Sequence, residues 1–153
     1  MFNLTNGINR DFTNNSITKG ESIMGYRSDV TYAILFRELS CKRKFVAIAK
    51  LNPQFNEALK ECEHVDDDKL FIHADFNYVK WYDEDEDVQC HMQMLDSIST
   101  NELDGVSAKF VRMGEENDDI EEMVFEGEDC PNGWSIHVGV SRHVYNEYAK
   151  RGD

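Results

Sequence analysis

Runs of alternating apolar and polar side chains constrain this chain more than any other feature. They occupy residues 29–36, 70–81, 106–113 and 134–140, and a shorter run lies near Met123. A period of two is the pattern of a β-strand that buries at least one face, because successive side chains point to opposite sides of a sheet. The run at 70–81 is the clearest. The sequence therefore predicts four or five strands.

Helical signals fall between these strands. Ser40 is a suitable N-cap for a first helix, and Asn52 before Pro53 is a good start for a second. The acidic residues 84–87 give a third helix the negative first turn that its dipole favours. The predicted helices cover residues 41–51, 53–65 and 88–99; in the first, Phe45, Ile48 and Ala49 face inward and Lys42, Arg43 and Lys44 outward.

This order of elements predicts an α+β fold, with a mostly antiparallel sheet of four to five strands and two or three helices on one face. A chain of 153 residues with 41% hydrophobic residues is the usual size of one domain. Residues 1–23 are rich in Asn, Thr, Ser and Gly without periodicity, so we expect a flexible N-terminal tail. We place a single domain at 24–145 and a frayed C-terminus at 146–153.

The chain carries no run of eighteen apolar residues and no signal-peptide pattern, so we expect a cytosolic protein without membrane contact. The four cysteines, at positions 41, 62, 90 and 130, form no CxxC pair, and we interpret them as reduced thiols. The formal net charge is −14, which argues against direct binding of nucleic acid because phosphate contacts need Lys and Arg. Residues 61–153 hold 25 of the 30 acidic side chains.

Motifs that carry chemistry are weak. The DEDED segment at 83–87 fails as an EF-hand, since Val88 and Met94 stand where that loop needs Gly and Glu. The five histidines lack the spacing of a zinc site, and neither a nucleophile motif nor a phosphate-binding loop occurs. We therefore expect no catalytic residue, no cofactor and no metal. A small metal-assisted hydrolase that uses clustered carboxylates remains the alternative from another class.

The acidic residues are grouped in three runs, at 61–68, 82–87 and 115–129, which could converge on one side of the domain. Such a negative field would steer the protein onto a basic or nucleic-acid-binding partner, either by imitating DNA or through an interface with aromatic anchors. The residues that we predict to bind this partner are Asp66, Asp67, Asp68, Trp81, Tyr82, Asp83, Glu84, Asp85, Glu86, Asp87, Glu115, Glu116, Asp118, Asp119, Glu121 and Glu122. Trp81 and Tyr82 are the anchors, although Trp81 could equally belong to the core.

The segment MGYRSDV at 24–30 resembles the first residues of small uncharacterised proteins encoded by tailed bacteriophages. The segments at 79–88, 110–121 and 140–142 resemble the same group. The resemblance implies a viral accessory protein in the host bacterial cytoplasm that inhibits a host enzyme or a defence system such as CRISPR; a structural virion component is a further alternative. We interpret Arg27 and Asp29, and Arg112 with Glu115 and Glu116, as internal ion pairs.

Overall fold

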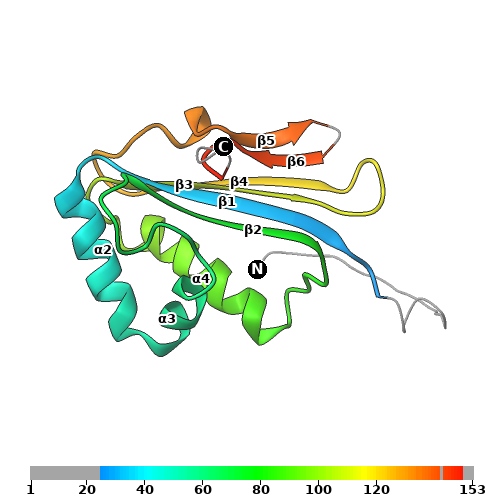
Figure 1. Cartoon of the computed structure of the whole chain (residues 1–153), viewed down its shortest axis with the longest axis horizontal. Helices are drawn as coiled ribbons and strands as arrows, with labels where there is room; N and C mark the ends of the chain where they lie inside the picture. The colour runs from blue at the N-terminus through cyan, green and yellow to red at the C-terminus, as the bar shows by residue number, and fades with distance from the viewer. Residues whose placement is uncertain (1–24, 142, 150–153) are drawn as a thin grey trace.

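A computed structural model of the chain describes residues 25–141 and 143–149 (Figure 1). It confirms the predicted α+β class. The elements, in chain order, are β1 (Ser28–Phe36), α2 (Leu39–Leu51), α3 (Pro53–Leu59), β2 (Phe71–Val79), α4 (Glu86–Thr100), β3 (Val106–Met113), β4 (Ile120–Glu126), the 3-10 turn η2 (Gly133–Ser135), β5 (Val138–Ser141) and β6 (His143–Asn146). No helix in these described ranges has the length and apolar character needed to cross a membrane.

The main sheet is antiparallel, with strand order β2-β1-β3-β4. Helices α2, α3 and α4 lie against one face, as Figure 1 shows. Alternate side chains of β1, among them Tyr32 and Ile34, meet Phe45 of α2 and Leu95 of α4 in the main core. All four are at most 4% exposed. Val88, Met92, Leu95 and Ile98, which recur along one side of α4, are all buried.

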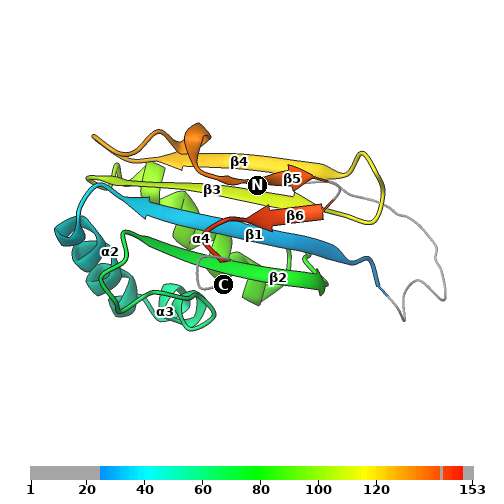
Figure 2. The same ribbon diagram turned by 45° about the horizontal axis from the view of Figure 1, so that its top comes forward.

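A β-hairpin covers the other face of the sheet, so the protein has three layers. Strand β6 lies over β1, and β5 lies over β3 (Figure 2). Ile136 and Val138 pack there against Ala33 and Val111. The sequence predicted one strand over 134–140, whereas Trp134 belongs to η2 and is 60% exposed. The Asn132 side chain accepts a hydrogen bond from the Trp134 backbone N–H, and this local bond favours the turn.

The first two helices differ from the sequence prediction in their bounds. α2 begins at Leu39 after Glu38, so Ser40 is not its N-cap. Asn52 does cap α3, where its side chain accepts hydrogen bonds from two backbone N–H groups, but the helix ends at Leu59 rather than at residue 65. Lys42 points inward and is 1% exposed, while Ile48 is 52% exposed. Both placements reverse the prediction, because the Lys42 amino group is held by the segment before β2.

Residues 1–24 and 150–153 lie outside the described ranges, so the predicted N-terminal tail is not tested. Asn146, which we placed in the frayed C-terminus, ends β6 and is 3% exposed. Its Nδ2 donates to Thr31 Oγ1 at 3.0 Å and to the Tyr32 carbonyl at 3.3 Å. The expectation of fraying is therefore wrong for Asn146, because the hairpin ties it to the centre of the sheet.

The antiparallel register fixes which loops share an end of the sheet. At one end, Ser28 pairs with Val79, and the β3–β4 turn follows Met113. At the other end, Leu35 pairs with Phe71, and Phe36 with Val106. The nine residues of β1 separate the two ends by about 30 Å. The loop after β2 and the β3–β4 turn thus meet at the first end.

Candidate functional site

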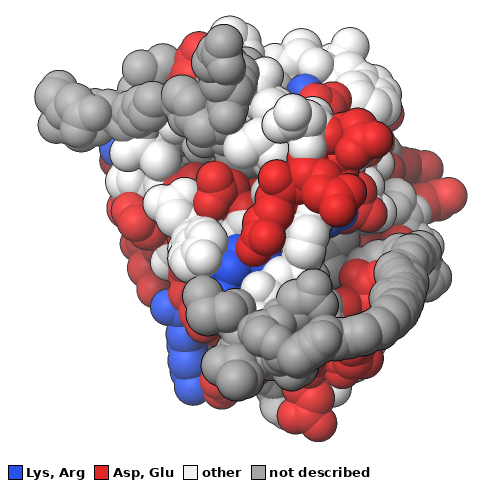
Figure 3. Space-filling model, turned by 90° about the vertical axis from the view of Figure 1, so that its right-hand side faces the viewer, with Lys and Arg blue, Asp and Glu red and all other residues white. Residues whose placement is uncertain are grey.

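Two of the three acidic runs come together at this first end of the sheet, which we call the acidic end. It consists of residues 82–87, between β2 and α4, and residues 115–122, in the β3–β4 turn and the start of β4. Figure 3 views this end of the molecule directly and shows Asp and Glu side chains outnumbering Lys and Arg. The exposed carboxylates here are Glu84, Glu86, Asp87, Glu115, Glu116, Asp118 and Glu122.

Two tyrosines hold the segments of the acidic end together. The Tyr82 hydroxyl accepts a hydrogen bond from the Tyr26 backbone N–H at 2.8 Å and donates to the Tyr26 carbonyl at 3.2 Å. The Tyr26 hydroxyl donates to Asp119 Oδ2 at 2.7 Å and accepts from the Glu116 backbone N–H at 3.2 Å. Burial is the main cause that raises the pKa of Tyr26 to about 12. The Tyr82 hydroxyl is therefore engaged within the fold, and the role of Tyr82 as an anchor for a partner stays a prediction.

Arg112 neutralises part of the charge. Its guanidinium donates to Asp119 Oδ1 at 2.5 Å and to Glu121 Oε1 at 2.7 Å. Burial lowers the pKa of Arg112, but these two hydrogen bonds outweigh it and hold that pKa above its usual range. The sequence predicted internal ion pairs for Arg112, which is correct, but with Glu115 and Glu116 as partners, which is not. Asp119 and Glu121 are thus partly compensated within the fold.

The carboxylates of the second run are crowded without full compensation. Burial, followed by the negative charge of Glu121, raises the pKa of Asp83 to about 6, although Arg112 acts in the opposite direction. Burial and then the charges of Glu84 and Asp87 raise the pKa of Asp85. Both shifts mean that ionising these groups costs free energy in the folded state. The acidic end therefore carries a negative field that the fold itself does not cancel.

The first acidic run does not join the other two. The Phe36 backbone N–H donates to the carbonyl of Leu70, which places the neighbouring residues 66–68 at the opposite end of the sheet. The Lys42 amino group donates to Asp67 Oδ1 at 3.0 Å, and that of Lys50 to Asp66 Oδ1 at 2.8 Å. The expected convergence is thus wrong for Asp66, Asp67 and Asp68. These residues line a hollow of about 460 Å³ together with Lys42, Arg43 and Lys50, so its charge is mixed.

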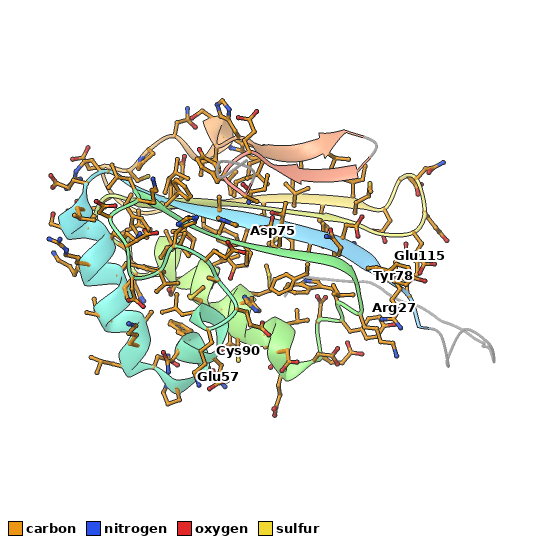
Figure 4. The ribbon with its side chains drawn as sticks, in the orientation of Figure 1. Arg27, Glu57, Asp75, Tyr78, Cys90 and Glu115 are labelled. Atoms are coloured by element: carbon orange, nitrogen blue, oxygen red, sulfur yellow. The ribbon has the colours of Figure 1, made fainter. Side chains whose placement is uncertain are left out.

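Trp81 belongs to the core, the second of the two readings that the sequence left open. Its ring lies 5.5 Å from that of Phe76 and 6.0 Å from that of Phe110, between centroids. The exposed aromatic residue at this end is Tyr78, at 62%. Arg27 places its guanidinium 5.2 Å from the centre of the Tyr78 ring, and Glu115 lies beside the pair in Figure 4.

Sequence reasoning missed Tyr78 because strict alternation along the run at 70–81 puts it on the same side as Ile72 and Ala74, which are buried. The register between β1 and β2 shifts between Ser28 and Val30, and Tyr78 has a left-handed φ of 56°. Such a bulge turns the next side chain to the opposite face. A bulge leaves no clear signal in an alternating run, so the exposure of Tyr78 could not be predicted from the sequence.

A buried polar chain crosses the main core. The Tyr32 hydroxyl lies 2.6 Å from His91 Nδ1, and His91 Nε2 lies 2.6 Å from Glu61 Oε1. Cys62 Sγ lies 3.3 Å from the Tyr32 hydroxyl, but burial raises the pKa of this thiol to about 12. A thiol with that pKa stays protonated at neutral pH and is a poor nucleophile. These hydrogen bonds can stabilise the core, but none of the four side chains that take part in them is activated for covalent chemistry.

A separate group of side chains has the composition of a metal site. One ligand atom each from Glu63, His64 and His73 lies within 4.8 Å of the others. Among the residues that the structure describes, no other cluster of three His, Cys, Asp or Glu side chains brings its ligand atoms this close together. Sequence reasoning missed it because His73 is ten residues away from Glu63 along the chain. The two residues meet through a backbone bridge, in which the Glu63 N–H donates to the His73 carbonyl at 2.8 Å.

No protein-family model, curated protein or solved structure matches this chain. The protein is therefore classified by its architecture and its surface charge. It is a three-layer α+β protein in which helices cover one face of an antiparallel sheet and a hairpin covers the other. Its distinguishing feature is the acidic end, built from two segments that are distant in the sequence.

Proposed function

We propose that this protein is a non-enzymatic binding protein that engages a basic partner through its acidic end and thereby inhibits or modulates that partner. The observation that carries the proposal is the meeting of residues 82–87 and 115–122 at one end of the sheet, where the pKa of Asp83 is raised to about 6. Carboxyl groups whose pKa is shifted by burial and by neighbouring charges cluster at functional sites, where a ligand can relieve the cost of ionisation. A partner surface rich in Lys and Arg would lower the free energy cost of ionising these carboxyl groups.

The surface also offers an aromatic anchor. Tyr78 is exposed beside the carboxylates and rests against Arg27, so that it needs little ordering before it contacts a partner. Electrostatic attraction would bring the partner to this end, and burial of Tyr78 would slow its release. A nucleic-acid-binding protein is the partner class that fits best, because its own basic surface is built to meet regularly spaced negative charge.

The setting of this function follows from the sequence resemblance alone. The segments at 24–30, 79–88 and 110–121 resemble small proteins of tailed bacteriophages, so we propose an accessory protein that acts in the cytoplasm of a host bacterium. Its target would then be a host enzyme or a defence protein that binds nucleic acid. In that role the acidic end would imitate DNA and occupy the nucleic-acid site.

Charge reversal tests the proposal at two exposed positions of the acidic end. The variant carries Glu84→Lys and Asp118→Lys, and the control carries Asp68→Lys and Glu128→Lys, which change the net charge equally away from the acidic end. Each immobilised protein is exposed to the heparin-binding fraction of a bacterial lysate. We expect the wild type and the control to retain the same basic protein, with affinity that falls as salt rises, and the Glu84/Asp118 variant to lose it.

Competition with duplex DNA then separates imitation of DNA from an ordinary interface. If the acidic end occupies a nucleic-acid site, added duplex releases the retained protein, whereas an interface elsewhere is insensitive to it. Equal retention by the wild type and the Glu84/Asp118 variant, or equal loss in the control, would refute the role of the acidic end. The Tyr78→Ala variant adds a second readout, with an expected loss of tenfold or more in affinity.

A further inference from the structure

We propose that Glu63, His64 and His73 form a binding site for one divalent transition-metal ion of the Zn²⁺ class. The site lies at the outer edge of β2, and it is independent of the acidic end and of the function proposed for it. Its ligands are a carboxylate oxygen of Glu63, Nε2 of His64 and Nε2 of His73. Three protein ligands of this kind leave a coordination position open for water or for a group from a partner.

His73 is the residue that points most directly to a bound ion. Its side chain is 1% exposed, and its Nε2 is buried without a hydrogen-bond partner. The nearest carboxylate oxygen across the site, Glu63 Oε1, is 3.8 Å away, which is too long for a hydrogen bond. A buried nitrogen left unpaired costs about 1–3 kcal/mol. A metal ion between His73 and Glu63 removes this cost, because the lone pair of Nε2 then coordinates the ion.

The other ring nitrogen of His73 is fixed as metal-binding histidines usually are. His73 Nδ1 lies 2.7 Å from Asp75 Oδ2, and since the carboxylate accepts, Nδ1 carries the proton and Nε2 carries the lone pair. Asp75 is itself held by Thr31, whose hydroxyl donates to Asp75 Oδ1 at 2.5 Å. Asn146 donates in turn to Thr31. The orientation of His73 is thus set by a chain of hydrogen bonds that reaches the C-terminal hairpin.

His64 repeats the same arrangement from the opposite side. Its Nδ1 lies 2.6 Å from Asp67 Oδ2, so Nε2 is the nitrogen available to an ion. The ring of His64 stands 5.5 Å from that of His73 and 5.2 Å from that of Phe71, between centroids. The left-handed backbone of His64, with φ 67°, turns its side chain toward β2. Two histidines that are each paired with a carboxylate thus converge on one point.

The geometry requires only a small adjustment on binding. Ligands of a tetrahedral zinc ion at about 2.0–2.1 Å lie about 3.3 Å from one another. One ligand atom from each of the three residues already lies within 4.8 Å of the others, and Glu63, with 71% of its side chain exposed, is free to rotate inward. His73 is fixed, and the ion approaches from the side of Glu63. Among the described hydrogen bonds of Glu63, Asp67 and Asp75, one involves an ammonium group, that of Lys42 on Asp67, so the charge at the ligand atoms favours a cation.

Cobalt titration of the full chain, after treatment with a chelator, tests the proposal. Co²⁺ replaces Zn²⁺ at sites of this type and is visible in absorption spectra, where thiolate ligands add a charge-transfer band. We expect one Co²⁺ per chain, displaced by Zn²⁺, without the thiolate band, since none of the three ligands is a cysteine. Glu63→Gln and His64→Asn should each weaken binding at least tenfold, and Asp75→Asn should weaken it by about 10- to 100-fold.

These variants separate loss of the site from loss of the fold. Glu63 is exposed, and Asn tolerates the left-handed backbone at position 64, so both variants should keep the far-ultraviolet circular dichroism of the wild type. His137→Asn removes an exposed histidine elsewhere and should leave Co²⁺ affinity unchanged. Absence of stoichiometric binding, a thiolate band, or unchanged affinity in folded Glu63→Gln and His64→Asn would each overturn the proposal.

Discussion

Replacing Asp83 by Asn should stabilise the protein at neutral pH. Asp83 is half-buried between β2 and α4, and burial together with the charge of Glu121 raises its pKa from 3.8 to about 6. For a carboxyl whose folded pKa is above its unfolded value, the stability contribution is fully present below pH 3.8 and is lost as the pH rises through about 6. Asn cannot ionise, so the variant does not suffer this loss.

The size of the effect follows from the two pKa values. A difference between 3.8 and about 6 corresponds to about 3 kcal/mol at 1.36 kcal/mol per pKa unit. Solvent screens a half-buried carboxyl, so we expect about 1–1.5 kcal/mol in practice. The gain should be near zero at pH 4 and complete at pH 7.5. The hydrogen bond that Gln89 Nε2 donates to the Asp83 backbone carbonyl at 3.1 Å does not involve the carboxyl group, so the substitution keeps it.

Urea denaturation at pH 4, 5, 6 and 7.5, followed by tryptophan fluorescence, to which Trp81 at the edge of the core contributes, measures this difference. Asp118→Asn removes the same charge from an exposed position and should change the free energy of unfolding by less than about 0.5 kcal/mol at every pH. A gain for Asp83→Asn that does not vary with pH, or one that Asp118→Asn reproduces, would refute the argument from local crowding and leave only a general effect of net charge.

Two further predictions concern buried charge. Lys42→Met should lower the free energy of unfolding by about 1–2 kcal/mol, because the buried amino group donates to Asp67 and, at 2.6 Å, to the Lys69 carbonyl. Lys50→Met removes an exposed ion pair and should lower it by less than about 0.5 kcal/mol. Thermal or urea unfolding of the two variants measures the difference. Burial lowers the pKa of His91, and the hydrogen bond to Glu61 partly restores it, so an NMR titration of the His91 ring should give a pKa below 6.5, which Glu61→Gln lowers further. The stability that neutral His91 contributes is present above pH 6.5 and is lost as the pH falls through the folded pKa. An unchanged His91 titration in Glu61→Gln would contradict this role of the carboxylate.

The sequence predicted the main sheet and the helices because their burial is periodic and local. The strand runs at 29–36, 70–81 and 106–113 match β1, β2 and β3 closely. The hairpin layer escaped prediction because it depends on what covers β1 from its second face. Both faces of β1 are buried, by the helices and by Ile136 and Val138. Alternation in a sequence shows that one face is apolar, and it does not show that a later segment will return to cover the other.

The placement of the acidic runs could have been inferred from the order of the predicted elements. Each strand or helix that crosses the layer carries the chain from one end to the other. One element, β2, lies between residues 66–68 and 82–87, so these runs are at opposite ends. Two elements, α4 and β3, lie between 82–87 and 115–119, so these runs share an end. What the sequence could not supply was the partial neutralisation by Arg112, Lys42 and Lys50, which depends on side-chain contacts.

The acidic end and the group of Glu63, His64 and His73 lie at opposite ends of β2, and their carboxylates differ in how far the fold compensates their charge. Near its end, β2 leads into the carboxylates of the acidic end, where burial and then the charge of Glu121 raise the pKa of Asp83. Near its start, Asp67 and Asp75 are each hydrogen-bonded to a histidine, and Asp67 also to Lys42, so their charge is engaged within the fold. Because the two groups of carboxylates lie at opposite ends of β2, Asp83→Asn should change partner binding without changing Co²⁺ affinity, and Glu63→Gln should do the reverse. Coupling between the two measurements would mean that β2 transmits a change from one end to the other.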